Sequence, residues 1–168
     1  MAEFRIASRT PVAYVGLPRE ATMDTFSQAI GTAFDDLGRY VEQRGIDTTG
    51  ASLVRYRVAS HRTDFVIEVG FELTGRGDTP VVREPFVIDA LPGGHFAVAE
   101  QHGPYAWIGG LTRELMAWGD ARGMDYALDQ GTGGIDTWQC WYEWYPAPPT
   151  LGTQGPEGPV EVCLLLRP

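Results

Sequence analysis

The chain has 168 residues, 43% hydrophobic and 21% charged, a composition typical of a globular domain with a sizeable core. Its net charge of −9, with no lysine, argues against a nucleic-acid-binding face and excludes Schiff-base catalysis by a lysine side chain. With no apolar run of transmembrane length and no signal-peptide pattern at the start, we expect a cytoplasmic protein without direct nucleic-acid or membrane partners.

The first half of the chain predicts one helix among three strands. Apolar residues recur at helical spacing in the long segment before Gly45, which is a suitable helix end, and Thr22 or Asp24 can cap the start. The last strand alternates apolar and polar residues, as a strand with one buried face does. The expected elements are a strand over 4–17 broken at Pro11, a helix over 22–44, and strands over 53–59 and 65–73.

The second half predicts the same order of elements. Pro104 is placed to open its helix, Gly123 to close it, and the apolar stripe between them contains Trp107, Leu111, Leu115 and Trp118. The expected elements are a strand over 86–100 with a bend at 92–94, a helix after Pro104, and strands over 138–147 and 160–166.

The ends of the two expected helices indicate an internal repeat. The segment "LGRYVEQRGI" (37–46) aligns with "LMAWGDARGM" (115–124) through a leucine, an aromatic residue and an Arg-Gly pair. We therefore predict a single α+β domain over 1–168 that contains two β-α-β-β repeats, about 1–75 and 82–168. Their strands form one antiparallel sheet with both helices on one face, and a ligand cleft lies on the pseudo-two-fold axis, on the opposite face.

Neither a metal nor a cofactor is expected from the sulfur and imidazole side chains. Cys140 and Cys163 form no close-spaced pair and lie in apolar strand-like segments, so we predict two buried free thiols. The three histidines are scattered along the chain without metal-ligand spacing.

The stretch "DTWQCWYEWYP" (136–146) places one carboxylate, Glu143, in the densest aromatic cluster of the chain. A carboxylate without a partner in such surroundings costs several kcal/mol or takes up a proton. Strand alternation separates Trp141, Glu143 and Tyr145 from the wholly aromatic and apolar set of Trp138, Cys140, Tyr142 and Trp144. We predict that the second set packs on the helices and that the first set forms an aromatic cage for an organic cation in the cleft.

Two interpretations of Glu143 stay open from the residues alone. Arg55 and Arg57 lie on the equivalent strand of the first repeat, and a buried ion pair with one of them would satisfy the carboxylate without a ligand. Otherwise a ligand supplies the partner. The further candidates for lining this ligand site are Tyr14, Tyr56, Phe65 and Glu68 in the first half, and Tyr105, Trp107 and Trp138 in the second.

The second half resembles the GyrI-like small-molecule-binding domain family. The resemblance rests on "LPGGHFAVAEQHGPYAWIGGLTRELMAWGDARGM" (91–124), "WYEWYPAPP" (141–149) and "VEVCLLLRP" (160–168), and the first half follows through the duplicated fold. Gln101 and Pro148 depart from the family pattern, which usually has His and Asp there. The matching positions are Gly103, Pro104, Tyr105, Trp118, Gly123, Glu143, Tyr145, Pro149 and Glu161.

The resemblance implies a stand-alone ligand-binding domain whose Glu143 meets hydrophobic, often cationic, aromatic compounds. Relatives also suggest an alternative, a hydrolase that opens strained cyclopropane-type rings with Glu143 as general base and Tyr145 or Tyr105 as proton donor. A third class, inhibition of a protein such as DNA gyrase, rests on family membership alone, and it leaves the protein partner unknown.

Overall fold

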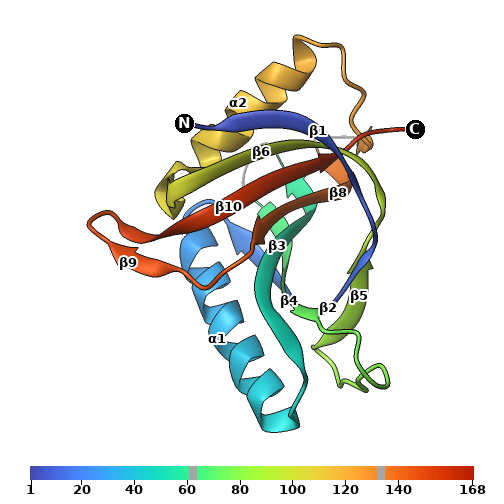
Figure 1. The fold of residues 1–168 in the computed structure, drawn as a ribbon, viewed down its shortest axis with the longest axis vertical. Helices are drawn as coiled ribbons and strands as arrows, with labels where there is room; N and C mark the ends of the chain where they lie inside the picture. The colour runs from blue at the N-terminus through green and yellow to red at the C-terminus, as the bar shows by residue number, and fades with distance from the viewer. Residues whose placement is uncertain (61–63, 132–134) are drawn as a thin grey trace.

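The computed structural model describes residues 1–60, 64–131 and 135–168, with side chains described outside 58–65 and 132–136. Its strands form one ten-stranded sheet, and two helices cover it, so the α+β class is confirmed (Figure 1). The elements are β1 (Glu3–Arg9), β2 (Val12–Thr22), α1 (Phe26–Arg44), β3 (Thr48–Ser60), β4 (Asp64–Leu73), β5 (Val87–Leu91), β6 (Gly94–Pro104), the 3-10 turn η1 (Tyr105–Trp107), α2 (Ile108–Asp120), β7 (Leu128–Gln130), β8 (Ile135–Tyr145), β9 (Thr150–Gly152) and β10 (Gly155–Leu165).

The long helix α1 begins later than predicted. Its N-cap is Thr25, so the prediction that Thr22 or Asp24 caps it is wrong. The side chains of Thr22 and Thr25 instead hydrogen-bond to each other over 3.0 Å, which closes a short turn before the helix. Gly45 ends the helix as predicted, with a left-handed φ of 61° that a glycine adopts without steric cost.

The sheet has a symmetric order, β1-β6-β10-β8-β3-β4-β2-β5, with β8 and β3 at its centre. Each half of the sheet takes its outermost strand from the other half of the chain, since β1 pairs with β6 and β5 pairs with β2. One register continues through both pairings, from Arg9↔Gly94 to Val12↔Leu91. Because β1 runs directly into β2, this shared ladder joins the two ends of the sheet and curls it into a closed shape (Figure 1).

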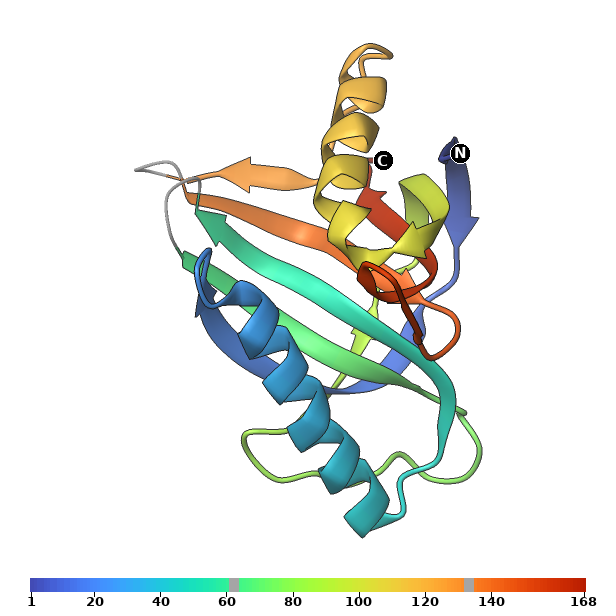
Figure 2. The ribbon, with the colours of Figure 1, turned by 90° about the vertical axis from the view of Figure 1, so that its left-hand side faces the viewer.

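Both faces of the curled sheet are buried. The outer face packs against α1 and α2, which lie on the same side of the central strands (Figure 2). The concave face encloses a second cluster of buried side chains that includes Tyr14, Phe96 and Tyr142, and both free cysteines, Cys140 and Cys163, lie in it as predicted. No helix among the described residues is both long and apolar enough to cross a membrane.

A pair of glycines makes room for Tyr14 on the concave face. Gly16 of β2 pairs with Gly70 of β4, and a methyl group at Gly70 would lie 2.7 Å from the Tyr14 ring and 3.1 Å from Leu53. We expect Gly70→Ala to lower the free energy of unfolding by about 1–3 kcal/mol, because a packed core does not absorb an extra carbon without strain. Gly38→Ala, on an open part of α1, should instead gain about 0.5–1 kcal/mol. Equal stability of the two variants in chemical denaturation would contradict this.

Candidate ligand-binding site

Glu143 lies at the centre of the sheet, on the outer face between the two helices. It pairs with Val54 across the two central strands, and its side chain is 4% exposed. The hydroxyl of Tyr56 donates a hydrogen bond to Oε1 over 2.7 Å, and the hydroxyl of Tyr145 donates one to Oε2 over 2.5 Å. The carboxylate is therefore held by two tyrosines, one from each half of the chain.

Burial sets the protonation of this group. Loss of solvent raises the pKa of Glu143 above its ordinary value of 4.5, although the hydrogen bonds from Tyr145 and Tyr56 act in the opposite direction. Burial and the nearby carboxylate also raise the pKa of both tyrosines well above 10.0, so that their hydroxyls keep their protons. No arginine hydrogen-bonds to or forms an ion pair with Glu143 among the described residues.

Aromatic rings surround the carboxylate on the outer face. Trp141 stacks on Tyr56 with ring centroids 4.1 Å apart, and Phe26, the first residue of α1, stacks on the same tyrosine at 5.9 Å. On the other side, Tyr105 of η1 contacts Tyr145 with centroids 5.0 Å apart. The first turns of both helical segments thus each place a ring against a tyrosine that binds Glu143.

The two tyrosines occupy equivalent positions on the two central strands. Val54 and Glu143 are directly opposite each other in the antiparallel pair, and Tyr56 and Tyr145 each follow two residues later. A local two-fold axis through the Val54–Glu143 pair therefore exchanges the two tyrosines. It would also exchange Val54 with Glu143, although one is apolar and the other is a carboxylate. Glu143 is the point at which this symmetry is broken.

The chain is similar to several solved structures over almost its whole length. It matches the C-terminal domain of EcmrR with a TM-score of 0.70 at 11% identity, covering 99% of this chain and 98% of that domain. It has the GyrI-like fold. No family model and no curated protein matches the sequence, and at such low identity the likeness to solved structures is one of fold alone.

Other proteins with the GyrI-like fold differ in what they bind or catalyse. In a complex of EcmrR with DNA, this chain matches 57% of the length of the EcmrR chain. SAV2435, solved with bound tetraphenylphosphonium, matches with a TM-score of 0.58 at 12% identity, covering 98% of this chain and 94% of SAV2435. A hydrolase from Listeria innocua matches with a TM-score of 0.58 at 8% identity, covering 98% and 92% of the two chains.

The predicted orientation of β8 within this GyrI-like fold is wrong. Trp141, Glu143 and Tyr145 lie on the face that the helices cover, whereas Cys140 and Tyr142 lie on the concave face. Trp138 does pack on the helix side, but it shares that side with Trp141, with ring centroids 5.2 Å apart. The candidate site thus lies between the helices and not on the opposite face.

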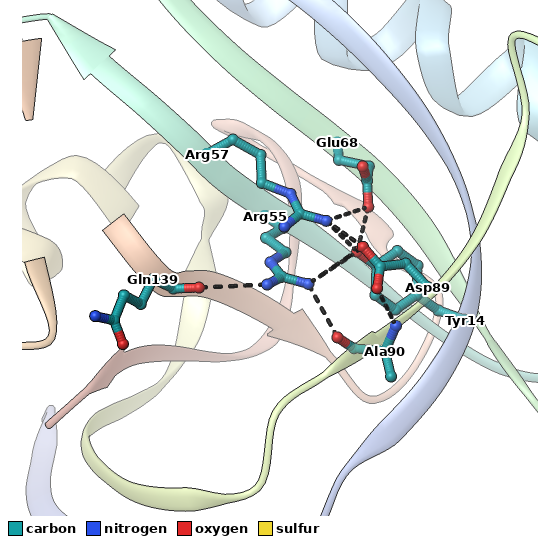
Figure 3. A network of polar contacts seen from close by, with 7 residues as sticks. All are labelled: Tyr14, Arg55, Arg57, Glu68, Asp89, Ala90 and Gln139. Carbon is teal, nitrogen blue, oxygen red and sulfur yellow. Dashed lines mark hydrogen bonds and ion pairs between the residues drawn. The ribbon is translucent and has the colours of Figure 1, made fainter. Parts of the chain in front are cut away.

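The arginines of β3 bind elsewhere, on the concave face. Arg55 is 5% exposed, and its Nη1 donates to the hydroxyl of Tyr14 over 3.2 Å and to the carbonyl of Ala90 over 3.0 Å. Its Nη2 donates to the carbonyl of Gln139 over 3.3 Å (Figure 3). The interpretation in which Arg55 or Arg57 neutralises Glu143 is therefore wrong, because Arg57 also joins this concave-face network.

Two predicted site residues belong to the same concave-face network. Tyr14 donates its hydroxyl hydrogen to Glu68, and Arg57 lies 3.4 Å from the Glu68 carboxylate and also pairs with Asp89 (Figure 3). Tyr14 and Glu68 are thus separated from Glu143 by the thickness of the sheet. In this network two guanidinium groups, including that of Arg55, balance two carboxylates.

The remaining predicted residues divide between the site and its surroundings. Tyr56, Tyr105 and Trp138 lie in the aromatic surroundings of Glu143, whereas the Trp107 side chain is 50% exposed and packs against Gly103. The side chain of Phe65 lies outside the described residues.

Two cavities are found away from Glu143. One of about 920 Å³ lies between the end of α1 and residues 74–81, and one of about 480 Å³ lies around Tyr126 and Arg167. Neither is lined by Glu143 or by its two tyrosines. Glu143 itself has almost no contact with solvent.

Sequence reasoning missed Phe26. Phe26 is the ring that α1 places on Tyr56, but it is not among the site residues predicted above. Its counterpart Tyr105 was found because it begins the second helical segment next to a loop. The predicted duplication could have pointed to Phe26, because it implies equivalent roles for the first residues of the two helical segments.

Proposed function

We propose that the protein binds hydrophobic, often cationic, aromatic small molecules at Glu143 and the rings around it. The observation that carries the proposal is a carboxylate that is 4% exposed, surrounded by rings, with tyrosine hydroxyls and no cation as its partners among the described residues. Burying a carboxylate without a cationic partner costs free energy, and a bound cation would offset that cost. Each aromatic face around a desolvated cation adds about 2 kcal/mol.

Access to the carboxylate requires displacement of a ring. Phe26 lies on Tyr56 and Tyr105 lies on Tyr145, so one of these two rings must swing away before a ligand contacts Glu143. Both belong to the first turn of a helical segment, where the backbone is held by fewer hydrogen bonds than in a helix interior. The proposed ligand then takes the place of the displaced ring against the tyrosines.

A pair of ions with the same shape and opposite charge tests the proposal. We expect tetraphenylphosphonium to bind the wild-type protein and tetraphenylborate to bind at least about tenfold more weakly, since tenfold corresponds to only about 1.4 kcal/mol. Glu143→Gln should reduce this charge preference by about tenfold, as measured by isothermal titration calorimetry. Glu114→Gln, which removes the same charge at an exposed position of α2, controls for the acidic field of the whole chain. Uniform affinity across wild type and Glu143→Gln would remove Glu143 from the site.

Hydrolysis of a strained ring is the second candidate function. It is favoured by the hydroxyl of Tyr145 at 2.5 Å from a carboxylate whose burial raises its pKa, the arrangement of a general base beside a proton donor. Glu143 would take a proton from water as the water oxygen attacks a ring carbon. The electron pair of the breaking ring bond would stay on a substrate carbon, which would take the proton of Tyr145. The proton held by Glu143 would then pass to the Tyr145 oxygen and restore both groups. Mass spectrometry of a cyclopropane-bearing compound incubated with the protein decides it: an unchanged compound excludes this function, and turnover that Glu143→Gln abolishes supports it.

A further inference from the structure

Two polar hydrogens near Glu143 have no acceptor in the described part of the protein. Five buried side-chain donors lack a hydrogen-bond partner there, and two of them, Nε1 of Trp141 and the hydroxyl of Tyr105, belong to rings of the candidate site. Leaving such a group buried and unpaired costs about 1–3 kcal/mol, and native structures contain few of them. Acceptor atoms of a bound molecule would pair two such donors in one aromatic cluster.

The two unpaired donors lie on either side of the carboxylate. Trp141 stacks at 4.1 Å on Tyr56, which donates to Oε1 of Glu143. Tyr105 lies 5.0 Å from Tyr145, which donates to Oε2. Each unpaired donor therefore belongs to a ring that packs on a tyrosine bound to the carboxylate, and neither donor forms a hydrogen bond with Glu143 itself.

The chemistry of these two donors defines which ligand atoms can form hydrogen bonds with them. An indole N–H only donates, and the Tyr105 hydroxyl has a hydrogen left to donate, so a carbonyl oxygen of an otherwise cationic ligand can pair with either group. We infer that this site selects aromatic cations that carry a carbonyl oxygen over hydrocarbon cations of the same charge and size, and that Trp141 and Tyr105 determine this selectivity. The inference rests on the proposed binding function, and it adds an acceptor requirement to the positive charge.

A matched pair of ligands separates the two requirements. (Anthraquinon-2-ylmethyl)trimethylammonium and (anthracen-2-ylmethyl)trimethylammonium share a charge and a three-ring outline, and they differ in two carbonyl oxygens. A hydrogen bond contributes about 0.5–1.5 kcal/mol net, so we expect wild type to bind the anthraquinone cation about 3- to 10-fold more tightly for each carbonyl that finds a donor. Fluorescence quenching and calorimetry measure both affinities.

Two conservative variants assign the preference to its donors. Trp141→Phe and Tyr105→Phe keep a ring and remove one polar hydrogen each, so each should lower affinity for the anthraquinone cation about 3- to 10-fold more than affinity for the anthracene cation, which reports any loss of ring contact alone. Glu143→Gln should weaken both cations by the same factor. Equal binding of the two cations to wild type would overturn this inference and leave the proposed function standing, whereas binding of neither cation would overturn both.

Discussion

Arg55→Met should lower the free energy of unfolding by about 3–5 kcal/mol, the largest loss expected from any single substitution considered for this chain. Arg55 is 5% exposed and supplies one of the two positive charges that balance Glu68 and Asp89. Without it, two carboxylates share the single guanidinium of Arg57, and the carbonyls of Ala90 and Gln139 lose a donor. A methionine fills the volume but pairs with none of these groups.

The measurement is thermal and chemical unfolding of Arg55→Met beside a matched control. Arg113→Met makes the same chemical change at an exposed position of α2, and surface substitutions of this kind stay within about 0.5 kcal/mol. The melting temperature of Arg55→Met should fall by roughly 10 °C, because about 1 kcal/mol shifts a domain of this size by roughly 2–4 °C. A loss no greater than that of the control would show that the buried network contributes nothing to stability.

Glu143→Gln should make the unliganded protein progressively more stable than wild type as the pH rises. Because the pKa of Glu143 is raised in the folded state, the folded protein holds this proton more tightly than the unfolded chain does. The unfolding free energy of wild type therefore falls as the pH rises from the unfolded value of 4.5 through the higher folded pKa. Glutamine carries no proton to lose, so its difference from wild type grows over the same range.

Chemical denaturation at about pH 4.5 and about pH 8 measures this effect. The stability difference between Glu143→Gln and wild type should increase by more than about 1 kcal/mol between the two conditions, since one unit of pKa corresponds to about 1.4 kcal/mol. Glu114→Gln, at an exposed site on α2, should show a much smaller change. A difference that stays constant with pH would mean that Glu143 titrates alike in the folded and unfolded states.

Both helices and the long strands of the fold were predictable because they have local signals. Helical spacing and Gly45 defined α1 to within a turn at its start, and Pro11 marked the break between β1 and β2. The short strands β7 and β9, of three residues each, carry no such pattern and were missed. The boundaries of the two repeats, about 1–75 and 82–168, stay a prediction.

The orientation of β8 was not predictable from alternation, for two physical reasons. The curled sheet buries both faces of its central strands, so an apolar set of side chains no longer identifies the helix side. The register also shifts between β3 and β8, from Tyr56↔Trp141 to Val58↔Thr137, and two extra residues of β8 fall within that shift. This irregularity accounts for Trp138 and Trp141 sharing a face, against strict alternation.

The face of the sheet on which Arg55 lies could not be predicted without knowing the register between β3 and β8. Once Val54 is known to pair with Glu143, Arg55 and Arg57 must point to the other face of the sheet. A shift of one residue would have placed an arginine beside the carboxylate and satisfied it. That Glu143 has no arginine partner among the described residues is thus a result of pairing between distant strands, which no local sequence pattern predicts.

The long ladder that joins residues 3–16 to residues 87–100 has a consequence for how the chain reaches its folded state. During synthesis, residues 3–16 find this partner only after the chain has been made as far as residue 100. Until then β1 has no strand beside it and β2 lacks β5, so both present hydrogen-bonding edges that favour association with other chains. We therefore expect closure of these distant contacts to be a late step that governs the rate of folding.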